Sequence, residues 1–105
     1  MKKLLIILYL FAMTAHADTA STLSRYKGYT IVDVLTIEGW IDKNGKRESS
    51  FNGCEYGRVI IFSGNKSLRC SSYGYQYAYR PEAVIISRGG SYTMIVESDS
   101  YDMSN

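Results

Sequence analysis

Residues 29–42 read YTIVDVLTIEGWID, and this stretch decides the fold class. It is dense in β-branched and aromatic residues, which favour strands, and it has no apolar stripe at helical spacing. Apolar side chains occur at both odd and even positions, for example at Ile31 and Val32. A strand with apolar side chains on both faces is typically long and strongly bent, and Gly39 marks the expected bend or bulge.

The chain after this strand reads as a series of hairpins. Asn44-Gly45 is a strong two-residue turn signal, and a returning strand is expected over 46–51. Farther on, residues 59–70 read VIIFSGNKSLRC; a two-residue turn at Gly64-Asn65 would align its two arms. That register predicts one shared apolar core face. Its members are Val59, Ile61, Leu68 and Cys70.

A last hairpin is expected where Arg88-Gly89-Gly90 joins two apolar runs, 81–87 and 91–98. The sequence therefore predicts an all-β fold of five or six short antiparallel strands, a small barrel of the SH3-like or OB-like type. A small two-sheet β-sandwich is the alternative.

The two ends of the chain differ from this pattern. Residues 1–17, MKKLLIILYLFAMTAHA, have a basic start, an apolar run and a small-residue cleavage site, which is the pattern of a secretory signal peptide. The apolar run is about half the roughly 20 residues of a membrane-spanning helix. We therefore expect a periplasmic or secreted protein with no membrane span after cleavage. Residues 18–27 are expected to form a flexible leader, 28–98 a single β domain, and 99–105 a polar, frayed tail.

Removal of residues 1–17 from the 105 leaves 88, with ten basic and ten acidic side chains and no histidine. A neutral chain argues against nucleic acid as a partner, because that affinity comes mainly from neutralising phosphates. Without histidine the chain cannot build a Ser-His-Asp site, a His-ligated zinc site or the usual pH switch. No cofactor or metal is expected.

Two cysteines, Cys54 and Cys70, remain in the exported chain. An oxidising compartment favours a disulfide between them, which would stabilise the fold by roughly 3 kcal/mol through the loop it closes. This bond requires Cys54 to fold back over Glu55-Tyr56-Gly57 toward Cys70.

Residues 73–81, YGYQYAYRP, carry four tyrosines at alternate positions. In an extended backbone Tyr73, Tyr75, Tyr77 and Tyr79 point to one side. The rings either cover an otherwise exposed sheet as part of the core or form a recognition surface, since tyrosine suits both roles.

The favoured hypothesis is a binding module that recognises an envelope protein, a peptide or a cell-wall polymer. Its expected contact residues are the four tyrosines together with Arg80 and Trp40. A hydrolase or hydrolase inhibitor that uses Glu38, Asp42 or the acidic tail is the second hypothesis, and a purely structural accessory protein is the third. A homodimer through the tyrosines stays open, because an exposed aromatic face promotes self-association.

Overall fold

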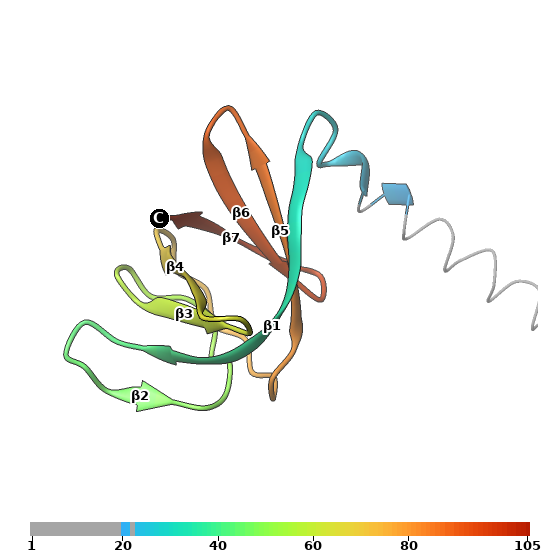
Figure 1. Ribbon diagram of the computed structural model, residues 1–105. Helices are drawn as coiled ribbons and strands as arrows, with labels where there is room; N and C mark the ends of the chain where they lie inside the picture. Colours follow the sequence, from blue (N-terminus) through green and yellow to red (C-terminus); the bar gives the residue numbers. More distant parts are fainter. Residues whose placement is uncertain (1–19, 22) are drawn as a thin grey trace, which may run out of the picture.

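A computed structural model describes residues 20–21 and 23–105, which form a small antiparallel β-barrel (Figure 1). The strands are β1 (Thr30–Ile41), β2 (Arg47–Glu48), β3 (Val59–Phe62), β4 (Lys66–Cys70), β5 (Glu82–Arg88), β6 (Ser91–Val96) and β7 (Asp99–Ser104). Six strands close the barrel in the order β1-β3-β4-β7-β6-β5, because β5 pairs with β1 again; β2 is an extra strand on β1. The prediction of an all-β small barrel is confirmed.

The predicted signal peptide lies outside the described residues. Of the predicted leader, residues 20–21 and 23–24 are helical and exposed.

Strand β1 is long and bent, as its two-sided apolar pattern predicts (Figure 1). Its first half pairs with β5 and its second half pairs with β3 and β2. The register with β3 shifts between Ile37 and Gly39, which confirms the expected bulge. A Cβ on Gly39 would lie 2.1 Å from the backbone oxygen of Glu48, so only glycine lets β2 approach β1 here.

The β3–β4 hairpin has a different register from the predicted one. Phe62 pairs with Lys66 and Ile60 with Leu68, so the loop holds three residues, 63–65. This shift by one residue turns β3 over, because side chains alternate along a strand. Ile60 and Phe62 are buried instead of the predicted Val59 and Ile61, which are half-buried. The prediction holds for Cys70, which is buried, while Leu68 packs against the core from its edge.

The other two hairpins show why turn length is hard to predict. The first also has a three-residue loop, 43–45, because the amides of Asn44 and Lys46 both donate to a side-chain oxygen of Asp42 at 2.8 Å. Gly45 completes this turn with a φ of 88°. The last hairpin forms where it was expected, but its loop holds only residues 89–90, since Arg88 pairs with Ser91.

The C-terminal residues form strand β7, so the expectation of a frayed tail is wrong. Strand β7 pairs with β6 along its whole length and with β4 through Met103 and Ser104. Tyr101 and Met103 are buried in the core. Two alternate apolar residues among polar ones are a period-2 signal, which the polar composition of the segment concealed.

The core fills the barrel with apolar side chains from every barrel strand. Its buried members include Ile37, Phe51, Ile60, Phe62, Ala83, Ile85, Met94, Val96, Tyr101 and Met103. The disulfide Cys54–Cys70 lies among them, which confirms the predicted pairing. The chain folds back as expected, because the Gly57 amide donates to the Cys70 carbonyl at 3.0 Å and the Cys70 amide donates to the Arg58 carbonyl at 2.7 Å.

Candidate binding surface

The tyrosine-bearing segment, residues 73–79, is held in an extended form by residues 51–54. Two isolated antiparallel bridges join them, one between Phe51 and Ala78 and one between Cys54 and Gly74. In each bridge both backbone amides donate to the opposite carbonyls, at 2.8 to 3.0 Å. Because Cys54 is also tied to Cys70 by the disulfide, the segment is fixed both along its length and just before its start.

Gln76 fastens the inner face of the segment to the β6–β7 turn. Its side-chain amide donates to the Val96 carbonyl at 3.2 Å and to the Glu97 carboxylate at 3.1 Å. Its amide oxygen accepts a 2.7 Å hydrogen bond from the Tyr101 hydroxyl. Burial, with a smaller effect from the charge of Asp99, raises the pKa of Tyr101 to about 12, so the hydroxyl keeps its proton at neutral pH.

The four tyrosine side chains lie on the outer face of this segment. Their exposed fractions are 61 to 73%, whereas Gly74, Gln76 and Ala78 on the inner face are half-buried. The rings therefore lie outside the core. We call Tyr73, Tyr75, Tyr77 and Tyr79 together the tyrosine surface. A fifth exposed ring, Tyr56, lies across a hollow from Tyr73.

This hollow has a volume of about 280 Å³, and both polar and apolar atoms form its walls. It is lined by Asp42, Lys43, Asn44, Glu55, Tyr56, Arg58 and Tyr73. Aromatic rings together with carboxylate, amide and ammonium groups in its lining give it both stacking faces and hydrogen-bonding groups.

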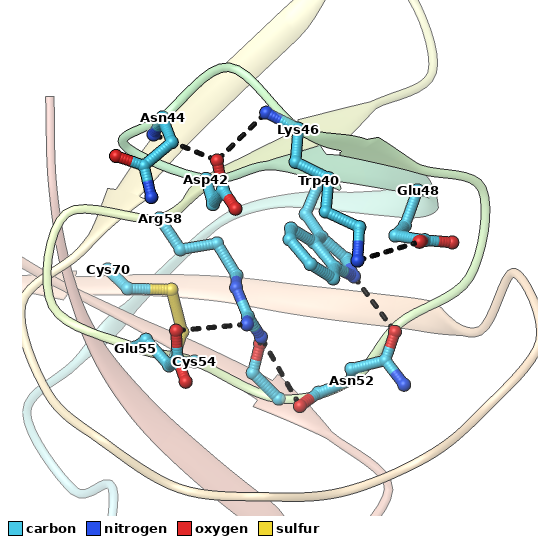
Figure 2. A network of polar contacts seen from close by, with 11 residues as sticks. Trp40, Asp42, Asn44, Lys46, Glu48, Asn52, Cys54, Glu55, Arg58 and Cys70 are labelled. Atoms are coloured by element: carbon cyan, nitrogen blue, oxygen red, sulfur yellow. Dashed lines mark hydrogen bonds and ion pairs between the residues drawn. A yellow bond between two sulfur atoms is a disulfide. The ribbon is translucent and has the colours of Figure 1, made fainter.

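Arg58 builds one wall of the hollow and is itself almost fully buried, with 9% of its side chain exposed. Its guanidinium lies 3.8 Å from the centre of the Trp40 ring. It donates to the Gly53 carbonyl at 3.1 Å and pairs with the Glu55 carboxylate at 3.3 Å (Figure 2). Its Nε has no partner among the described residues.

The other two predicted contact residues differ in their exposure. Trp40 is buried, with 7% exposed, and its indole nitrogen donates to the Asn52 side-chain oxygen at 2.9 Å (Figure 2). Arg80 is exposed beyond the end of the segment, where it adopts a φ of 46° and pairs with Glu38 at 3.7 Å. Trp40 therefore presents little surface to a partner, whereas Arg80 is exposed directly after Tyr79.

The acidic residues of the second hypothesis have structural partners or lie apart. Glu38 is paired with Arg80, and Asp42 accepts the hydrogen bonds of its turn. The tail carboxylates are spread over the β6–β7 turn and the exposed positions of β7: Glu97, Asp99 and Asp102. Within residues 20–21 and 23–105, no three carboxylate, cysteine or histidine side chains gather as a metal site.

Three residues that matter for this site were missed by the reading of the sequence. Gln76 could have been found from the sequence, because a polar residue between two outward-pointing tyrosines must point inward. Arg58 has no such signal, because the Trp40 ring that it covers lies far from it in the chain, and the signal of Tyr101 is limited to the alternation of apolar and polar residues in β7.

Comparison with protein-family models, curated proteins and solved structures found no match to this chain. No helix in the described part of the chain has the length and apolar character needed to cross a membrane.

Proposed function

We propose that this protein is a small exported binding module that recognises its partner through the tyrosine surface. The observation that carries the proposal is the exposure of four rings on a backbone that is held by paired hydrogen bonds and by Gln76. Exposed tyrosines on a fixed backbone lose little entropy on binding, because only two side-chain torsions remain to be ordered in each. Rings of this kind are enriched among the residues that dominate binding energy.

Of the three partner classes, the hollow favours a cell-wall polymer, because its lining combines apolar and polar surface. A sugar ring has an apolar face that stacks on an aromatic ring and hydroxyl groups that bond to carboxylates and amides. The hollow offers both, since Tyr56 and Tyr73 stand beside Asp42 and Glu55. A polymer bound at Tyr73 would extend along the remaining rings.

A pull-down tests the proposal directly. The protein is incubated with purified cell wall and, separately, with envelope protein extract, and is compared with a Tyr75→Ser, Tyr77→Ser variant. Because both rings are exposed, we expect the variant to fold normally by circular dichroism and to lose at least ten-fold in retention on cell wall. An Ile31→Ser, Val34→Ser variant is the matched control, since it removes two exposed apolar side chains from β1 instead.

The outcomes separate the partner classes. Loss of cell-wall retention in the tyrosine variant but not in the control supports the polymer, and Tyr56→Ser should then weaken retention as well. If the tyrosine variant instead loses only a protein that wild type captures from the envelope extract, the partner is a protein or peptide and not the polymer. Equal behaviour of the wild type and both variants contradicts binding through the tyrosine surface.

A further inference from the structure

The backbone of residues 73–79 presents an unpaired strand edge. Gly74 and Ala78 direct their amide and carbonyl groups toward residues 51–54. Backbone groups of successive residues alternate between the two edges of an extended strand, so Tyr75 and Tyr77 direct theirs the other way. In the described part of the chain neither residue makes a backbone or side-chain hydrogen bond at these groups.

Two other open edges of the barrel, on β1 and β2, carry charged side chains. On β1 the Val34 amide donates to the Asp33 carboxylate at 2.9 Å, and the second oxygen of that carboxylate pairs with Lys66 at 2.8 Å. Strand β2 has only two residues, Arg47 and Glu48, and both are charged. Short strands and charged side chains are the usual protection against pairing between molecules. Residues 73–79 contain no charge and no proline, so this edge lacks that protection.

The tyrosines of this edge are arranged symmetrically. In YGYQYAY they lie at equal distances on both sides of Gln76. We propose that a second copy of this chain pairs with this edge in antiparallel register about a two-fold axis at Gln76. Tyr75 of each copy then faces Tyr77 of the other, and Tyr73 faces Tyr79. Facing aromatic pairs stabilise antiparallel strands.

Charge and area set the strength of this dimer. The two Arg80 side chains fall at opposite ends of the paired strands, so they do not repel each other at close range. The four rings expose on the order of 500 Å² per copy. Pairing by edges covers only part of this area, so the surface buried on the two copies together stays below the roughly 1,200 Å² of a stable interface. The dimer is therefore transient, with a Kd of about 10 to 1,000 µM.

This inference goes beyond the proposed function, because it concerns the backbone edge rather than the faces of the rings. Edge pairing leaves those faces outside, and the rows of the two copies join into one continuous aromatic surface. A polymer long enough to cross the axis would contact both copies and would strengthen the dimer by mass action.

Sedimentation equilibrium of the protein, expressed from its full sequence, tests the register with a pair of charge variants. In a Tyr75→Lys, Tyr77→Lys variant like charges face each other across the axis, and we expect the dimer to be lost. In a Tyr75→Glu, Tyr77→Lys variant opposite charges face each other twice, so association should return to within about three-fold of wild type. A wild type that stays monomeric up to about 1 mM, or charge variants that associate equally, would overturn the proposal.

Amide hydrogen exchange keeps the test independent of any substitution. On raising the concentration of wild type through the association range, the Tyr75 and Tyr77 amides should gain protection of at least ten-fold. The Val34 amide, already bonded to Asp33, is the internal control and should not change. Association without protection of Tyr75 and Tyr77 would show contact through ring faces and would also overturn edge pairing.

Discussion

Arg58 is a charged residue that is almost fully buried, and its surroundings explain how the fold accommodates it. Burying a charge is costly unless it is paired and hydrogen-bonded. Trp40 supplies a ring face, Gly53 a carbonyl and Glu55 a carboxylate. These contacts hold residues 52–55 against the start of β3. The tyrosine-bearing segment is bridged to the overlapping residues 51–54, so Arg58 also supports its position.

Replacement of Arg58 measures what these contacts contribute. Arg58→Met keeps the length of the side chain but leaves the Gly53 carbonyl without a donor, so we expect a loss of about 1 to 3 kcal/mol in the free energy of unfolding. Arg58→Lys keeps the charge without the planar guanidinium group, so its loss in the free energy of unfolding should be smaller. Urea unfolding followed by the fluorescence of Trp40, the only tryptophan, reports both. A methionine variant as stable as wild type would mean that the charge is not needed for folding.

Tyr101 makes stability depend on pH in the alkaline range. Its pKa is raised by burial to about 12 in the folded protein, above an ordinary value near 10. The protonated Tyr101 hydroxyl therefore contributes fully to the free energy of unfolding below pH 10, and this contribution is lost as the pH rises to 12. We expect Tyr101→Phe to cost about 1 kcal/mol at pH 8, because Gln76 loses a donor, and to cost less at pH 11. A difference between the two proteins that stays constant from pH 8 to 11 in urea unfolding would contradict this.

At the scale of elements, the pairing of residues 51–54 with 73–79 depends on a very close approach of two backbones. A Cβ on Gly53 would lie 2.0 Å from the Gly74 carbonyl oxygen. Gly53 also adopts a φ of 82°, which disfavours any other residue. The position of the tyrosine surface thus depends on a residue that carries no functional group.

Gly53→Ala and Gly45→Ala form a matched pair that isolates this approach. Both glycines have positive φ, 82° and 88°, but a Cβ on Gly45 would meet nothing within 4 Å. We expect Gly45→Ala to cost about 1 kcal/mol from backbone strain alone. Gly53→Ala should cost at least about 2 kcal/mol more, since backbone must move. Chemical unfolding measures both changes. Equal losses would show that the backbone of residues 51–54 can move away from a Cβ at position 53 without a cost in the free energy of unfolding.

Features that depend on local chemistry could be predicted from the sequence. The bend at Gly39, the hairpin at Gly89-Gly90 and the Cys54–Cys70 bond all follow from residue types near one another in the chain. The register of β3–β4 could not, because one added loop residue exchanges its buried and exposed faces. Strand β7 was missed because its stability comes from packing of Tyr101 and Met103 against partners elsewhere in the chain.

For the candidate site, the sequence predicts the alternation of the tyrosines but not which face is outside. That choice is made by the inward contacts of Gln76 with the β6–β7 turn and by the bridges to Phe51 and Cys54. Trp40 could not be assigned either, because the side chain that covers it, Arg58, is far from it in sequence.

At the scale of the whole molecule, one covalent bond joins the barrel to the surface. Cys70 ends β4 just before the tyrosine-bearing segment, and Cys54 pairs with Gly74 inside it. Residues 54 and 70 are separated by 16 positions, a loop whose closure stabilises a fold by roughly 3 kcal/mol.

A Cys54→Ala, Cys70→Ala variant should therefore lose about 3 kcal/mol in the free energy of unfolding. Beyond this global loss, we expect amide protection at Gly74 and Ala78 to fall more than protection in the β5–β6 hairpin, which is far from the bond in the chain. Hydrogen exchange of the oxidised protein and of the variant, compared residue by residue, measures both. Uniform loss of protection would show that the bond acts on the unfolded state only.

The bent strand β1 has a consequence for how the barrel assembles. Its first half closes the barrel against β5, so the pairing that completes the structure joins two strands that are far apart in the chain. Contacts between distant parts of a chain are slow to form, because the loop between them must be ordered first. We expect folding in milliseconds to seconds rather than microseconds, with closure by β1 and β5 as the late event. Until then the apolar side chains of both strands lie open to neighbouring molecules, so dilution during refolding should raise the yield of soluble protein.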